Sequence, residues 1–221
     1  MEFTERKLRL ASRLDAGEEG GSYGDGILII SSVLSACASQ LWSGRGIDKE
    51  RFVELWARYA NADARPLLIS VPLLLQALRE EAFGCGTAAE ALAGSSQKVL
   101  GHLDDHIITG RGVDLPAVEI QRLCPGLKTQ VVRRYSYPAV FYEQVRSAYV
   151  HEYKAGASAS AHRMAEDDDA VSYTNIVPPP HRRIHFPIGW LREITTGIVR
   201  AVEPIWNSSP LPRPRRWWLR G

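Results

Sequence analysis

Apolar residues recur at helical spacing along most of the longer segments of this chain, and this periodicity restricts the fold more than any other feature. Residues 4–14 place leucines at helical intervals before a glycine-rich turn. Residues 23–42 alternate large apolar residues with small ones, a pattern typical of a central helix that its neighbours approach closely. Asp48 stands where a helix N-cap is expected, ahead of aromatic and apolar residues at helical spacing.

Two more helices are expected in the second half of the chain, over residues 138–154 and 188–206. The first of them begins with proline. Proline lacks a backbone N–H, and this costs nothing in the first turn of a helix, where the N–H groups have no partner within the helix. Residues 171–177 and 183–186 flank three prolines and are rich in residues typical of strands, which predicts a small two-stranded ribbon. We therefore predict an all-α helical bundle with a minor β-ribbon near residues 171–186.

A tail rich in arginine, proline and tryptophan, residues 207–221, follows a single expected domain over residues 1–206. The tail holds four arginines and no acidic residue, so the rest of the chain has a slight acidic excess although the formal net charge is +2. Domains that bind nucleic acid through their overall charge are usually strongly basic. Any phosphate chemistry must therefore come from a local group of residues.

The three cysteines form no C-x-x-C pair, which argues against a disulfide scaffold and a structural zinc site. The first residues are charged and lack the apolar stretch of a signal peptide. The longest apolar runs, residues 27–42 and 67–78, are too short or too interrupted by serine for stable membrane insertion. We expect a cytoplasmic protein with reduced thiols.

The expected helix 138–154 carries an arginine and a histidine with four residues between them, Arg146 and His151. The two positions lie about 140° apart around a straight helix. They can meet at one phosphate only if the arginine side chain wraps around the helix, the helix end is distorted, or a second subunit forms the other wall of a cleft. Three tyrosines lie on or near the face of the arginine: Tyr142, Tyr149 and Tyr153.

This segment, PAVFYEQVRSAYVHEYK, resembles the motif helix of the HEPN (higher eukaryotes and prokaryotes nucleotide-binding) superfamily, whose helical bundles carry an R-x4-6-H motif. The resemblance covers these 17 residues and otherwise extends only to helical character and the late position of the motif. In many catalytic members an Asn, Asp or His follows the arginine, whereas Ser147 follows it here. A serine hydroxyl forms hydrogen bonds but does not readily take up a proton.

The resemblance implies metal-independent cleavage of RNA, in which the ribose 2′-OH attacks the adjacent phosphate. His151 would exchange protons with the 2′-OH or the leaving oxygen, and the planar fork of Arg146 would stabilise the charged transition state. Ser147 completes the implied catalytic set. The implied substrate-binding residues are Tyr142, Tyr149 and Tyr153, whose rings can stack on bases. DNA lacks the 2′-OH and should not be cleaved, and neither a metal nor another cofactor is implied.

HEPN proteins typically pair so that two motifs face each other, which implies a homodimer through residues 138–154. Members often serve in toxin–antitoxin or antiviral systems, which implies an antitoxin or defence-system protein as partner. Three alternatives stay open. In the first, the chain is a catalytically inactive HEPN-like module that binds nucleotide or RNA or joins an assembly. In the second, it is an adaptor that acts through its tail. In the third, Arg146 pairs with Glu143 or Glu152, and His151 only ends its helix.

Other signals for chemistry are weaker. His102 and His106 have the spacing of metal ligands but lack the glutamate of H-E-x-x-H enzymes, so a solvated turn is expected. His181 and His185 have the same spacing on an expected strand, where we predict a basic surface edge. The acidic run 166–169 suits a solvated loop. The chain has no P-loop, GxGxxG or Gly-x-Ser-x-Gly element, which argues against ATP hydrolysis, dinucleotide redox chemistry and an α/β-hydrolase.

Overall fold

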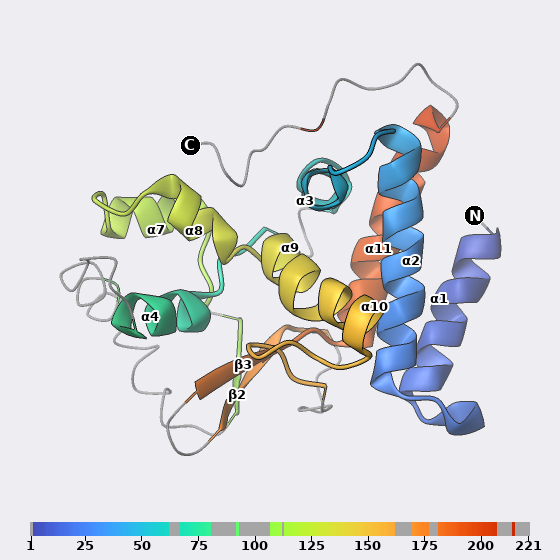
Figure 1. Cartoon of the computed structure of the whole chain (residues 1–221), viewed down its shortest axis with the longest axis horizontal. Helices are drawn as coiled ribbons and strands as arrows, with labels where there is room; N and C mark the ends of the chain where they lie inside the picture. Colours follow the sequence, from blue (N-terminus) through green and yellow to red (C-terminus); the bar gives the residue numbers. More distant parts are fainter. Residues whose placement is uncertain are drawn as a thin grey trace.

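A computed structural model describes residues 2–61, 67–80, 92, 107–111, 113–161, 169–176, 181–206 and 214. The described part is mainly helical with one small antiparallel sheet (Figure 1), which confirms the mainly α class. The helices are α1 (Glu2–Asp15), α2 (Tyr23–Leu41), α3 (Asp48–Tyr59), α4 (Val71–Glu80), α7 (Ala117–Leu123), α8 (Thr129–Arg134), α9 (Tyr137–Val140), α10 (Ser147–Glu152) and α11 (Ile188–Val202). A π-helical segment, Phe141–Arg146, joins α9 to α10. The predicted tail, except Pro214, and the residues His102, His106 and 166–168 lie outside the described residues.

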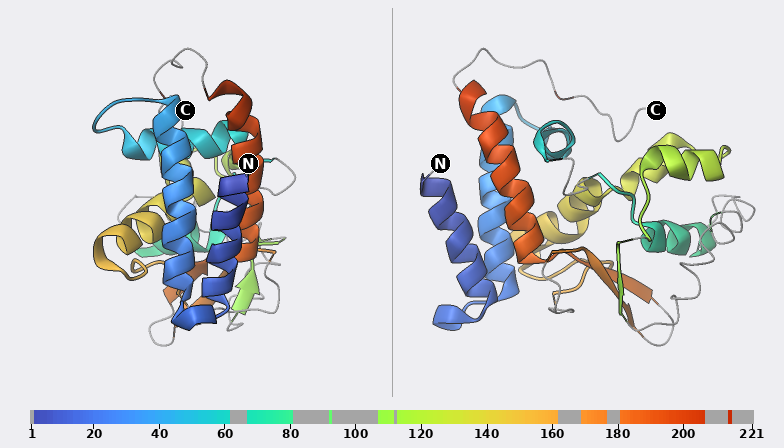
Figure 2. Two further views of the ribbon diagram at one scale, coloured as in Figure 1. Left: turned by 90° about the vertical axis from the view of Figure 1, so that its right-hand side faces the viewer. Right: turned by 180° about the vertical axis from the view of Figure 1, so that it is seen from behind.

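Helices α1, α2 and α11 lie side by side along their length (Figures 1 and 2). The small residues of α2 permit this close packing, as predicted. A Cβ atom added at Gly26 would come within 2.9 Å of the carbonyl oxygen of Ala11 in α1. Ser22 and Asp25 form a reciprocal capping box at the start of α2.

Helix α2 is long and apolar enough to cross a membrane by length and composition, contrary to the expectation that its serines rule this out. Half of it is buried, and it packs against α1, α3 and α11. Core helices of soluble proteins pass the same test of length and composition, and no other helix among the described residues passes it.

The helices begin close to the residues that the sequence signals indicate, except that the N-cap of α3 lies one residue earlier than expected. Ile47 holds the cap position of α3, so Asp48 is the first helical residue and lies in the first turn, where a negative charge is favourable. Pro138 lies in the first turn of α9, as predicted.

The sheet has three strands in the order β1 (Ile107–Thr109), β2 (Ser172–Ile176) and β3 (His181–His185), all antiparallel. The predicted ribbon corresponds to β2 and β3, and β1 adds a third strand that the sequence did not predict. A three-residue strand is too short to show a period. The central strand pairs Tyr173 with Ile108 on one side and Ile184 on the other.

The expectation of a basic surface edge at β3 is wrong for two of its residues. Arg182 and His185 are buried, at 5% and 3% exposure. Helix α4 packs against β3, and Ser160 donates its backbone N–H to the carbonyl of Ile184 at 2.8 Å. Tertiary cover, rather than strand periodicity, therefore decides which of these polar residues are buried.

An aromatic cluster ties the centre of the molecule together. The ring of Phe141 lies 6.1 Å from that of Phe52, 5.4 Å from that of Trp56 and 5.4 Å from that of Phe186. The ring of Trp190 of α11 lies tilted 5.9 Å from the rings of both Trp56 and Phe186. The segment that carries the arginine–histidine motif is thereby fixed to the core through α3 and α11.

Candidate functional site

The motif helix runs without interruption from Tyr137 to Glu152, which confirms the expected helix near residues 138–154. Its middle is π-helical: the backbone N–H of Ser147 donates to the carbonyl of Tyr142, five residues earlier. The helix ends at Tyr153, which has a left-handed backbone with φ of 54°.

The π-helical segment keeps one side of this helix on the core. Four residues at intervals of four are all buried: Tyr137, Phe141, Val145 and Tyr149. In a regular α-helix each step of four residues advances about 40°, so three steps would carry the last residue about 120° around the axis. A π turn is wider and reduces this advance. Because of the wider turn, residues spaced four apart along the whole motif helix all face the core.

Arg146 is half-buried, and its guanidinium lies over the ring of Tyr142, with 5.1 Å between the guanidinium carbon and the ring centroid. Its Nε atom is buried and has no hydrogen-bond partner in the structure. Neither expected carboxylate pairs with it, because Glu143 contacts Lys49 and Glu152 contacts Lys154. The positive charge is therefore held by a tyrosine face, an arrangement that leaves it able to bind an anion.

His151 is exposed in the last turn of α10. The five residues that follow Arg146, up to and including His151, are α-helical, so the two positions stay about 140° apart and about 7.5 Å apart along the axis. The π turn ends at Arg146 and does not rotate His151 toward it. Within one chain the structure does not bring the pair onto one face. Ser147, half-buried, directly follows the arginine.

Two of the predicted substrate-binding tyrosines, Tyr149 and Tyr153, contact the start of α2. Tyr149 is buried, and its ring lies edge-on to Tyr23 at 6.1 Å, where burial raises its pKa to about 12. Tyr153 is exposed, and its hydroxyl donates to Asp25 Oδ1 at 2.5 Å. Hydrogen bonds from Ser22 and then Tyr153 lower the pKa of Asp25. These contacts fasten the end of the motif helix to the start of α2.

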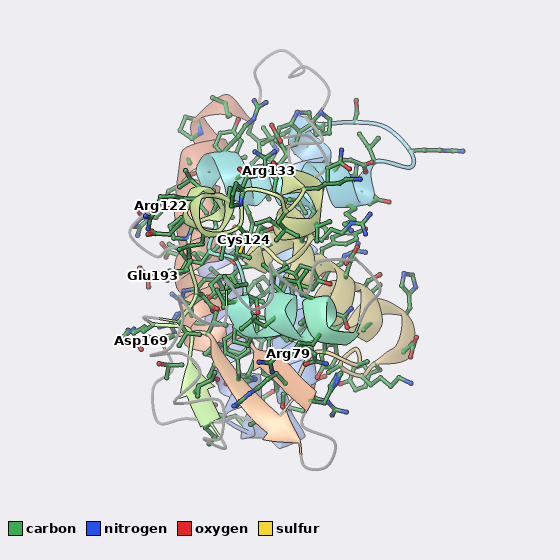
Figure 3. The ribbon with its side chains drawn as sticks, turned by 90° about the vertical axis from the view of Figure 1, so that its left-hand side faces the viewer. Arg79, Arg122, Cys124, Arg133, Asp169 and Glu193 are labelled. Atoms are coloured by element: carbon green, nitrogen blue, oxygen red, sulfur yellow. The ribbon has the colours of Figure 1, made fainter. Side chains whose placement is uncertain are left out.

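A polar cleft of about 450 Å³ lies beside the motif helix, and no motif in the sequence points to it. It is lined by residues from α3, α4, α8, the π-helical segment and β3, over a floor that includes Leu73, Ala77 and Val140. Figure 3 faces the end of the molecule that α4, α8 and the sheet form, with Arg79 of α4 and Arg133 of α8 labelled. The polar residues that line the cleft include Lys49, Gln76, Arg134, Glu143, Gln144 and His181.

The electrostatics of this cleft centre on Lys49. Burial and then the positive charge of Arg134 lower the pKa of Lys49 to about 8, against the opposite influence of Glu50. The carboxylate of Glu143 contacts the Lys49 amine and favours its charged form. The protonation of Lys49 therefore depends on whether an anion stays beside it.

Hydrogen bonds fix the two amide side chains of the cleft. Gln76 contacts the ring nitrogens of His181, and its Oε1 accepts the backbone N–H of Arg182 at 3.0 Å. Gln144 Oε1 accepts the backbone N–H of Ser158 at 3.2 Å. The walls are thereby held in place by contacts between elements distant in the sequence.

The chain matches no family model, no curated protein and no solved structure in the three comparisons made. Among the described residues, no group of three or more His, Cys, Asp and Glu side chains has the arrangement of a metal site.

Proposed function

We propose that this chain is a cytoplasmic, metal-independent endoribonuclease of HEPN type that cleaves RNA through attack of the 2′-OH. The observation that carries the proposal is Arg146, a cation that contacts no carboxylate among the described residues. It is held on the ring of Tyr142, one helical segment before the exposed His151. Arginine suits phosphate because its planar fork matches two phosphate oxygens.

The separation of the two side chains requires two copies of the chain. In each composite site, Arg146 comes from one copy and His151 from the other. The exposed apolar side chains beside His151, Val150 at 46% and Tyr153 at 56%, favour a homodimer contact through α10. The same surface would accept an antitoxin or defence-system protein as an inhibitory partner.

The chemistry of the composite site follows from these groups. The imidazole of His151 accepts the proton of the ribose 2′-OH, and the 2′-oxygen bonds to the phosphorus to form a 2′,3′-cyclic phosphate. The bond to the 5′-oxygen breaks, and this leaving oxygen takes up a proton from water. Arg146 stabilises the added negative charge, and the hydroxyl of Ser147 donates to a phosphate oxygen. Tyr153 is open to stack on a base, whereas Tyr142 positions Arg146 and Tyr149 supports the helix from the core.

The test is cleavage of RNA in EDTA by the unmodified protein, Arg146→Ala and His151→Ala, with Arg200→Ala, at an exposed position of α11, as the matched control. Each motif variant should lose ~10²–10³-fold in rate while the control does not. A mixture of the two inactive variants should recover activity, because a mixed dimer contains one complete site. Uncut RNA with the unmodified protein, or no recovery in the mixture when it forms dimers, would overturn the proposal.

A second candidate is a catalytically inactive HEPN-like module that binds RNA or nucleotide or joins an assembly. The observation that favours it is the separation of Arg146 and His151 within one chain, together with Ser147 after the arginine. This module would bind RNA without cleaving it. Arg146→Ala would then weaken RNA binding, whereas His151→Ala would leave it unchanged.

A further inference from the structure

We infer that the polar cleft between α3, α4, α8 and β3 binds a small phosphomonoester, with its phosphate between Lys49 and Arg134. Glu143 is the resident counter-ion that this phosphate displaces. Neither Arg146 nor His151 lines the cleft, so the inference stands apart from the proposed nuclease.

Two cations from different helices face this one cleft. Lys49 lies in the first turn of α3, with only 21% of its side chain exposed, and Arg134 ends α8. Their mutual repulsion is strong enough to lower the pKa of the lysine, after the effect of burial. Lys49 is partly buried and Arg134 is exposed, and holding the two like charges near each other costs free energy, which a bound anion recovers.

Among the described residues that line the cleft, Glu143 is the one carboxylate beside the two cations. Glu143 contacts Lys49, but its side chain is 45% exposed and can turn into solvent. A phosphomonoester carries a charge of about −1.5 to −2 at neutral pH, so it offers a counter-charge to Lys49 and Arg134 at once. A phosphate therefore matches the cleft better than a carboxylate does.

The size and lining of the cleft indicate that the ligand carries an organic group attached to that phosphate. A volume of about 450 Å³ exceeds what inorganic phosphate needs and lies within the range of small-molecule sites. Gln76 and His181 form one polar wall, and Gln144 and Ser158 form another. Hydroxyl groups on a short carbon skeleton can hydrogen-bond to both walls.

The walls are built before any ligand arrives. Gln144 accepts the backbone N–H of Gly156 at 2.7 Å through its carbonyl, and a Cβ atom at Gly156 would come within 2.6 Å of Gln144 Oε1. The loop thus passes close to the glutamine and holds its side chain. These groups lose little conformational freedom when a ligand binds, so the entropy cost that opposes binding is small.

The experiment is isothermal titration of the full chain with glycerol 3-phosphate, inorganic phosphate and glycerol at constant ionic strength. Glycerol 3-phosphate should bind saturably and more tightly than inorganic phosphate, and glycerol should not bind. Lys49→Met and Arg134→Gln should each weaken binding about tenfold or more, and Arg200→Gln should not. Glu143→Gln should tighten it, because the competing carboxylate is gone.

A pH series and an RNA control complete the test. Binding should weaken above about pH 8 in the unmodified protein, where Lys49, faced by Arg134, Glu143, Glu50 and His181, loses its proton. RNA cleavage by Lys49→Met should equal that of Arg200→Gln. No saturable binding of glycerol 3-phosphate, equal affinity in Lys49→Met and the control, or displacement of the ligand by RNA would overturn the inference.

Discussion

The two sides of the motif helix differ in what they do for the protein. On one side Tyr137, Phe141, Val145 and Tyr149 are at most 4% exposed and pack into the core. On the other, Glu143 and His151 are exposed, and Arg146 is half-buried over a tyrosine ring. One helix thus separates folding from chemistry, so substitutions on its two sides should have different consequences.

The largest effect is expected from Phe141→Ala, on the core side. Removing a fully buried phenyl ring at the centre of the aromatic cluster leaves a cavity and should lower the free energy of unfolding by ~3–5 kcal/mol. Urea denaturation followed by circular dichroism measures this. Val150→Ala, on an exposed position of the same helix, should change it by no more than ~0.5 kcal/mol. Similar losses of unfolding free energy in the two variants would show that the two sides of the motif helix do not differ in their contribution to stability.

A pH effect should follow from the contact that anchors the first turn of the helix. The fully buried carboxyl of Asp114 accepts hydrogen bonds from the hydroxyls of Tyr137 and Tyr173 and from the backbone N–H of Val71. Burial raises its pKa to about 7 from 3.8, and these hydrogen bonds oppose the shift without cancelling it.

The folded state therefore binds this proton more tightly than the unfolded chain does. The contribution of Asp114 is fully present below about pH 4 and is lost as the pH rises to about 7, a change on the order of a few kcal/mol. Denaturation midpoints between pH 4.5 and 8 should show this decline. In Asp114→Asn the decline should be smaller; an identical slope in both proteins would show that another group causes it.

Gly24→Ala tests the close approach of the helix to α2. A Cβ atom at this position would lie 2.8 Å from Cε1 of the buried ring of Tyr149, so the substitution should destabilise the protein by ~1–3 kcal/mol. Gly197→Ala is the matched control, because its new methyl group would lie 3.5 Å from the nearest atom. There the better helix propensity of alanine should stabilise the protein by ~0.5–1 kcal/mol. Thermal melts compare the two, and stabilisation in both would contradict the close contact.

The smallest effects are expected on the open side. Arg146→Ala loses only the contact with Tyr142, so its unfolding free energy should fall by ~0.5–1 kcal/mol, and His151→Ala should change it by less than ~0.5 kcal/mol. The same urea titrations measure both. A loss of several kcal/mol in either variant would assign that residue to the core and would make its effect on RNA cleavage uninformative.

Most helices were predictable because each has its own local signals. The capping box before α2, the proline at the start of α9 and the apolar spacing of α1 and α11 all act within a few residues. The motif pair was predictable for the same reason, since it lies on one helix. The π-helical segment was not, because its wider turn is set by the packing of Phe141 and Val145 against other elements.

The sequence by itself determined the helical class, the ribbon of β2 and β3, and the spacing of Arg146 and His151, since these follow from the order of neighbouring residues. Only the tertiary structure decided that β1 joins the sheet, that Arg182 and His185 are buried, and that Lys49 and Arg134 share a cleft. Each of these depends on residues tens of positions apart being brought into contact. Local periodicity carries no record of such contacts, because they arise from how whole elements pack.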